Sequence, residues 1–181
     1  MRLLSVLIFK ITGWKTAVND SPEIKRCVLI AAPHTSNWDF MYARAALYIL
    51  RIKVKFLIKD DYFFFPLNYI LKAMGAIPVD RSKAKGNKVE SLIDLFNTNE
   101  ELVTMIPAEG TRSLVKEFRK GFYHVANGAK VPIALGYLDY KKKIAGVGPL
   151  FYPTGDIDQD LQEIYAFYRT ITAKHPKDAM H

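Results

Sequence analysis

The sequence predicts one α/β domain with a mixed, largely parallel sheet flanked by helices. Its 181 residues suit a single domain, and half of them are hydrophobic, which is enough to bury a sizeable core and too many for a disordered chain. Short apolar runs alternate with segments of helical apolar spacing, the arrangement in which helices connect parallel strands. Near the C-terminus a short polar turn joins two strand-like runs. This hairpin predicts an antiparallel pair, and therefore a mixed sheet.

The net charge indicates the kind of partner, and the cysteine content indicates the compartment. The formal net charge is +8, which favours an anionic partner such as a phosphate-bearing substrate, an anionic lipid surface or a nucleic acid. No RNP-like motif, zinc-ligand spacing or long basic block favours nucleic acid specifically, so basic residues spread over a solvated face remain the simplest explanation. The only cysteine, Cys27, lies in an apolar run. We expect it to be a core residue in a reducing compartment.

Residues 1–14 are predicted to form an amphipathic helix, because apolar side chains recur at helical spacing from Leu3 to Trp14. The stretch is much shorter than the roughly 20 apolar residues that cross a bilayer, and no small-residue cleavage site follows it. It is therefore a candidate membrane-docking segment, and the alternative is a helix packed on the core. Residues 15–181 form the domain itself, beginning with a loop over 16–25.

The first strand-to-helix junction holds the strongest candidate site. A buried strand is expected over 26–30, and helical apolar spacing runs over 40–50, with His34 between them. Ser36 or Asn37 can cap this helix, which places Asp39 in its first turn. A carboxylate so close can fold back onto the imidazole and orient it as a general base. No serine or cysteine beside the pair is recognisable as a nucleophile, and Ser36 is a candidate helix cap, so the proton removed would belong to a substrate. The alternative is a loop histidine beside a helix-capping aspartate.

The same patterns predict the remaining elements. Strands are expected over 52–58, 76–79, 101–107, 130–137 and 143–150, and helices over 66–74, 89–96, 121–127 and 158–174.

Two further polar groups follow predicted strands. Arg81 comes directly after the strand at 76–79, and Glu109, Gly110, Thr111 and Arg112 follow the strand at 101–107. In the second group an acid, a hydroxyl and a guanidinium converge around a glycine that permits tight backbone geometry. Such a group can bind a phosphate or a substrate hydroxyl. It can also be an ordinary polar turn.

The order of these groups resembles the glycerolipid acyltransferase family, which includes the 1-acylglycerol-3-phosphate acyltransferases. The first family block, a histidine and an aspartate separated by four residues, is matched by His34-Thr35-Ser36-Asn37-Trp38-Asp39. The others, a glycine-led strand ending in arginine, a Phe-Pro-Glu-Gly-Thr-Arg-like turn and a Val-Pro-Ile strand, are similar to residues 75–81, 106–112 and 131–134. One departure is that Ala108 stands where the family has proline. Each block is weak alone, but four in order are specific.

The resemblance implies transfer of a fatty acyl group from acyl-CoA or acyl carrier protein to the hydroxyl of a lysolipid, with 1-acylglycerol-3-phosphate as the first candidate. The setting would be phospholipid biosynthesis, peripherally on the cytoplasmic side of the membrane. His34 and Asp39 would be the catalytic pair, acting directly on the acceptor hydroxyl without an acyl-enzyme. The thioester is a substrate, and no cofactor or metal is implied.

The resemblance also assigns binding residues. Arg81 and Arg112 would hold the acceptor phosphate through bidentate bonds. Glu109, with the turn at Gly110 and Thr111, would position the acceptor. The aromatic residues at 63–65 would line a groove for the acyl chain, although such a cluster is often core.

Other functions remain open on the sequence. A different lysolipid, such as one containing an amino acid, would present an anionic carboxylate to the same arginines. A non-catalytic membrane-binding or lipid-carrying module would keep the fold without chemistry, and the intact His34 and Asp39 argue against it. Nucleic-acid binding is not expected, and would require a steep salt dependence.

Overall fold

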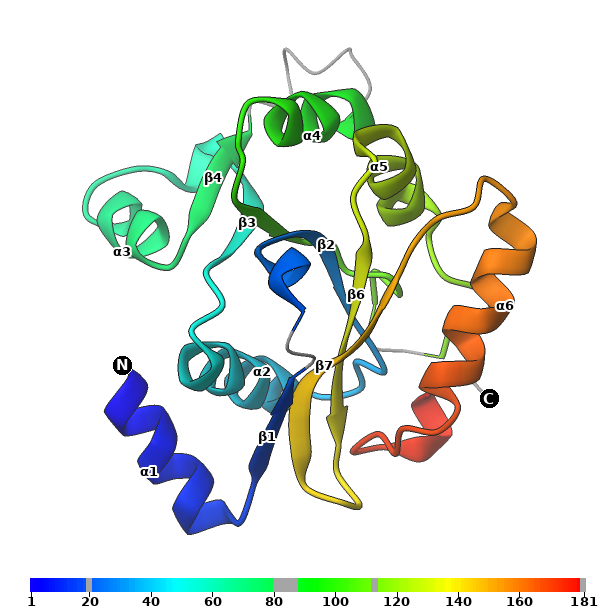
Figure 1. The fold of residues 1–181 in the computed structure, drawn as a ribbon. Helices are drawn as coiled ribbons and strands as arrows, with labels where there is room; N and C mark the ends of the chain where they lie inside the picture. The colour runs from blue at the N-terminus through cyan, green and yellow to red at the C-terminus, as the bar shows by residue number, and fades with distance from the viewer. Residues whose placement is uncertain (19–20, 80–87, 112–113, 180–181) are drawn as a thin grey trace.

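The computed structural model describes residues 1–18, 21–79, 88–111 and 114–179. Its strands form one seven-stranded sheet in the order β1-β7-β6-β2-β5-β3-β4 (Figure 1). The strands are β1 (Lys15–Val18), β2 (Arg26–Ala31), β3 (Val54–Lys59), β4 (Ala76–Val79), β5 (Leu102–Met105), β6 (Ile133–Asp139) and β7 (Ile144–Phe151). The helices are α1 (Arg2–Thr12), α2 (Asn37–Leu50), α3 (Leu67–Ala73), α4 (Lys88–Asn97), α5 (Gly121–Ala129) and α6 (Ile157–Tyr168).

The predicted fold class is confirmed. Every neighbouring pair of strands is parallel except β6 and β7, which form the predicted antiparallel hairpin. The central strand β2 lies between β5 and β6 and is covered on both faces. This double burial explains why its sequence is continuously apolar rather than alternating.

Successive residues of β2 supply the two halves of the core. Val28 and Ile30 pack in the cluster that α4, α5 and α6 cover, whereas Cys27 and Leu29 pack on the side of α2 (Figure 1). Cys27 is fully buried, as predicted, and burial raises the pKa of its thiol to about 12. The core therefore fixes both ends of β2, including the end that leads into His34.

Helix α1 packs on α2 through only part of its apolar surface. Ser5 and Phe9 are buried there, while Leu3 and Ile11 are 84% and 75% exposed. The predicted helix is thus present, but most of its stripe faces away from the domain. Among the described helices, none has both the length and the apolar character needed to cross a membrane.

Several predicted bounds differ from the structure by a few residues, as in the strand predicted over 130–137, which begins at Ile133. Residues 15–18, expected within or beside a loop, form the edge strand β1, which pairs with β7. Helix α5 continues through Gly128 and closes at Lys130, whose φ of 52° is left-handed. Helix α6 ends at Tyr168 instead of reaching residue 174. Each difference lies at a boundary or an edge, where tertiary contacts outweigh local pattern.

Candidate active site

The candidate site lies at the carboxyl ends of β2 and β5, the edge at which open α/β sheets bind ligands. These strands are parallel neighbours with Leu29 opposite Met105, so their following loops start side by side. The loop after β2 carries His34, and the loop after β5 carries Glu109. The topology alone therefore joins two of the sequence groups.

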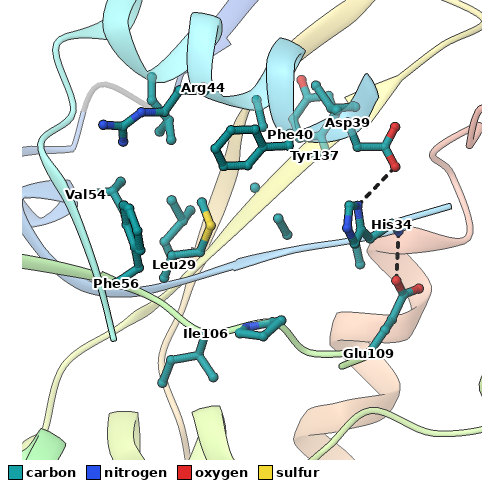
Figure 2. Close-up of a pocket in the computed structure, with 18 of the residues that line it drawn as sticks. Leu29, His34, Asp39, Phe40, Arg44, Val54, Phe56, Ile106, Glu109 and Tyr137 are labelled. Carbon is teal, nitrogen blue, oxygen red and sulfur yellow. Dashed lines mark hydrogen bonds and ion pairs between the residues drawn. The ribbon is translucent and has the colours of Figure 1, made fainter. Parts of the chain in front are cut away.

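His34 and Asp39 are in direct contact, as predicted (Figure 2). Imidazole Nδ1 lies 3.1 Å from Asp39 Oδ2, which also accepts the backbone N–H groups of Thr35 and Ser36 at 2.8 Å each. Because an ionised carboxylate only accepts hydrogen bonds, His34 Nδ1 carries the proton and Nε2 keeps its lone pair. The free nitrogen is the one that can take a proton from a substrate.

The local sequence builds this geometry. Ser36 caps α2 by accepting the N–H of Trp38, and Asp39 occupies the third helical position in a capping box. The same carboxylate is thus a helix cap and the partner of His34. The position at the helix N-terminus also favours its negative charge.

The hydrogen bonds keep Asp39 ionised although it is only 5% exposed. Burial by itself raises the pKa of this carboxyl, but bonds from His34, Tyr140, Ser36 and Thr35 together outweigh it and lower the pKa below its ordinary value. A carboxylate held in this state can stabilise a protonated imidazole.

Glu109 holds the His34 loop through a hydrogen bond to its backbone. Its Oε2 accepts the backbone N–H of His34 at 2.8 Å, and its side chain is buried (Figure 2). Burial raises the pKa of Glu109, and the bond from His34 offsets this only in part. The contact seen is with the catalytic loop, so the predicted role in positioning the acceptor stays a prediction.

The turn after Glu109 holds a residue that sequence analysis missed. Gly110 has a left-handed φ of 67°, and a Cβ there would lie 2.4 Å from Arg119 Nε. The guanidinium of Arg119 therefore lies directly over the glycine. Arg119 lies in the basic stretch 116–120, and no local signal in the sequence indicates that it reaches this turn.

The two predicted phosphate-binding arginines cannot be compared with this geometry. Arg81 and Arg112 lie outside the described residues. Thr111 is exposed and lines the same cavity as His34 and Gly110.

A largely apolar cavity of about 1010 Å³ extends from His34 and Asp39 along α2 (Figure 2). Its lining comes from α2, from the strand ends and from α4, and includes Phe40, Ala43, Leu47, Val54, Phe56, Leu92, Met105 and Ile106. No serine or cysteine is among the described residues that line it. Residues 63–65 do not line it either, contrary to expectation, and Phe64 and Phe65 are exposed.

Arg44 lies at the end of the cavity remote from His34 (Figure 2). Its guanidinium donates to the carbonyl of Met74 at 2.6 Å and to the hydroxyl of Tyr48 at 3.1 Å. It also lies over the Tyr48 ring, 4.7 Å from the centroid. A cation thus lies opposite the histidine, in a cavity whose lining is mostly apolar.

Known proteins give the site its context. The crystal structure of the 1-acyl-sn-glycerophosphate (LPA) acyltransferase PlsC from Thermotoga maritima is similar to this chain, with a TM-score of 0.61 and 14% identity, over 93% of this chain and 76% of that one. At this identity the likeness shows the fold alone. None of the curated proteins matches.

The sequence model described as Acyltransferase matches residues 15–134. The match contains the histidine–aspartate block, the glycine-led strand and the turn after β5, and it ends in β6. It confirms the resemblance drawn from these blocks. Since it spans well over half of the chain, this protein belongs to the acyltransferase family.

Proposed function

We propose that this protein transfers a fatty acyl group from an acyl thioester, acyl-CoA or acyl carrier protein, to the hydroxyl of 1-acylglycerol-3-phosphate in phospholipid biosynthesis. The observation that carries the proposal is the His34–Asp39 pair at one end of a large apolar cavity. A base beside an apolar space suits a reaction that joins a hydroxyl to a fatty chain.

The chemistry follows from the orientation of the imidazole. His34 Nε2 takes the proton of the acceptor hydroxyl while its oxygen attacks the thioester carbonyl. The tetrahedral intermediate collapses, the carbon–sulfur bond breaks, and the protonated imidazole returns the proton to the departing thiolate. Asp39 stabilises the imidazolium between these steps. Because no serine or cysteine is among the described lining residues, direct transfer without an acyl-enzyme is the simplest route.

The cavity supports a fatty acyl donor. Its volume of about 1010 Å³ is at the upper end of small-molecule sites, which typically measure about 300–1,000 Å³. Each methylene group removed from water contributes about 0.8 kcal/mol. An acyl chain lying along α2 would therefore gain binding energy from its whole length and bring its thioester to His34.

The acceptor phosphate is assigned to Arg81 and Arg112, on the resemblance and on the fork geometry of arginine. Arg119 adds a guanidinium beside Gly110. Thr111 and the Gly110 turn, which line the cavity near His34, are proposed to position the acceptor together with Glu109.

Peripheral membrane docking completes the proposal. The outward face of α1 exposes Leu3, Leu4, Leu7 and Ile11, and the chain carries a net charge of +8. This combination suits an interfacial helix on an anionic surface. We propose that the protein acts peripherally on the cytoplasmic side of a membrane.

The test is an assay of wild type and His34→Ala with acyl-CoA or acyl carrier protein thioester and a panel of lysolipids, with products identified by mass spectrometry. We expect 1-acylglycerol-3-phosphate to be acylated, and the variant to lose activity by roughly 10²–10⁴-fold. His124→Ala is the control, since His124 is exposed in α5 and does not line the cavity. Wild type that binds vesicles but transfers nothing would favour the non-catalytic module.

A further inference from the structure

The oxygen of Asp39 that does not face His34 has its own partner. Asp39 Oδ1 accepts the hydroxyl of Tyr140 at 2.6 Å, across 101 residues of sequence. We propose that Tyr140 is a positioning residue for the reaction: its phenol fixes the Asp39 carboxylate in the orientation that holds His34. This inference rests on the proposed function, because it assigns Tyr140 to the same catalytic pair.

Tyr140 is well held where it lies. It follows β6 in the hairpin, and its backbone N–H donates to the carbonyl of Thr172 at 2.9 Å. Its ring meets Trp14 edge-on with centroids 5.0 Å apart, and Tyr42 of α2 with centroids 6.2 Å apart. The phenol is therefore placed by contacts from three separate parts of the chain.

The carboxylate is fully engaged only when Tyr140 is present. Oδ2 receives the bonds from His34, Thr35 and Ser36, whereas the described residues give Oδ1 the phenol alone. Without that donor, a buried carboxylate oxygen would lack its partner, which is costly, and the group could rotate. Burial first, and then the bond to Asp39, raise the pKa of Tyr140 far above its ordinary value. The phenol remains a donor at every working pH.

The bond also sets how strongly Asp39 holds an imidazolium. A phenol that donates to a carboxylate draws off part of its negative charge, so less is available to the protonated imidazole. Loss of the phenol should strengthen that attraction and keep His34 protonated to higher pH. Among the described residues, the other titratable groups beside the pair include Glu109 and Tyr42. Lys174 and His175 also lie against the His34 loop, next to Trp38 and Thr35. All of them are retained in a variant substituted at Tyr140, so a shift would report the lost bond.

The chain contains a matched control for this bond. The hydroxyl of Tyr123 donates to Asp160 Oδ2 at 2.7 Å, and both residues are buried. Asp160 lies in the first turn of α6, as Asp39 lies in the first turn of α2. Neither Tyr123 nor Asp160 lines the cavity. The two tyrosine-to-phenylalanine changes therefore remove the same chemical bond, one at the site and one away from it.

The experiment compares Tyr140→Phe with Tyr123→Phe in kcat, KM and the pH dependence of kcat/KM. For Tyr140→Phe we expect kcat to fall on the order of tenfold, which corresponds to about 1.4 kcal/mol, with KM for the acyl donor little changed. We expect the acid limb of its pH profile to move to higher pH. Tyr123→Phe should lower the thermal unfolding temperature while leaving kcat and the pH profile as in wild type.

Two outcomes would overturn the inference. One is wild-type kcat and pH profile in Tyr140→Phe, and the other is an equal loss of kcat in Tyr123→Phe, which would indicate a general effect on stability. If Tyr140→Phe does not fold, a fluorotyrosine placed at residue 140 keeps the shape and donates more strongly. It should move the acid limb to lower pH, and an unmoved limb would overturn the proposal.

A separate readout distinguishes this inference from the proposed function. The NMR titration of the His34 ring needs no substrate, so it can be followed even if no lysolipid is acylated. An absence of transfer in wild type would reject the proposed reaction alone. A His34 titration unchanged by Tyr140→Phe would reject the role of Tyr140, whatever the substrate.

Discussion

At the scale of single residues, one carboxyl group ties the site to the fold. Asp39 caps α2, accepts from His34 and accepts from Tyr140. Glu109 supports the other side of the same loop through the backbone of His34. The fold shifts the two carboxyl groups in opposite directions, since the pKa of Asp39 is lowered and that of Glu109 is raised. Substitution of either acid should therefore change the stability of the protein with a different dependence on pH.

The buried charge of Glu109 should cost stability at neutral pH. Its raised pKa means that the folded protein binds a proton on this carboxyl more tightly than the unfolded chain does. Its contribution to stability is present below the ordinary glutamate value of about 4.3 and is lost as pH rises through the folded-state pKa. Glu109→Gln, which can still accept the His34 N–H, should gain stability relative to wild type between pH 4 and pH 7.

Urea unfolding at the two pH values measures this difference. Glu163→Gln, on the exposed surface of α6, controls for the loss of one negative charge. A stability difference for Glu109→Gln that is the same at both pH values would contradict the electrostatic argument.

The predicted phosphate contact can be tested by a conservative change. Arg112→Lys keeps the charge but removes the fork that matches a phosphate. We expect kcat/KM on 1-acylglycerol-3-phosphate to fall by about 1.5–3 kcal/mol, the typical cost of a lost charged hydrogen bond. Transfer to monoacylglycerol, which lacks the phosphate, should be poor in wild type and little changed by the substitution. Equal proportional losses on both acceptors would assign Arg112 to the fold or the donor.

At the scale of elements, the two faces of α1 differ in their surroundings. Phe9 is 4% exposed and packs on α2, whereas Leu3, Leu7 and Ile11 face outward. Changing these three outward residues to serine should weaken sedimentation with anionic vesicles and leave thermal unfolding almost unchanged. Phe9→Ala is the contrasting variant, expected to lose roughly 3–5 kcal/mol of stability. Undiminished vesicle binding by the serine variant would remove α1 from the membrane contact.

The elements also show where sequence reasoning succeeds. The central strand β2 was predictable because its burial on both faces produces a continuous apolar run. The start of α2 was predictable because its capping residues are neighbours in the sequence. The strand β1 was not, since its four residues gain their structure only by pairing with β7. A faint signal existed: a Cβ at Gly146 would lie 1.9 Å from the carbonyl oxygen of Ala17, so glycine marks the close approach.

At the scale of the whole molecule, the site depends on residues that the chain brings from far apart. His34 and Asp39 were predictable because only four residues lie between them, but Tyr140 and Arg119 were not, because no periodicity links them to the pair. The cavity could not be predicted for the same reason. Its walls come from α2, the strand ends and α4 together, and the aromatic run at 63–65 does not line it.

The size of the cavity predicts the length of acyl chain that the protein accepts. Ala43 lines it from α2, so Ala43→Phe should fill part of the space and shift preference toward shorter acyl donors. Ala73→Phe, on an exposed position of α3 outside the cavity, is the matched control. Competition between donors of different length, measured by kcat/KM, gives the result. An unchanged preference would mean that the acyl chain lies elsewhere.

The aromatic contacts around Tyr140 also determine which part of the protein its intrinsic fluorescence detects. Both tryptophans lie near groups that hold Asp39. Trp14 is stacked on Tyr42 and edge-on to Tyr140, and Trp38 is exposed one residue before Asp39 with Lys174 over its ring. Intrinsic fluorescence will therefore follow this corner of the molecule rather than the average fold. Where emission and far-ultraviolet circular dichroism give different unfolding midpoints, the site opens separately from the rest of the sheet.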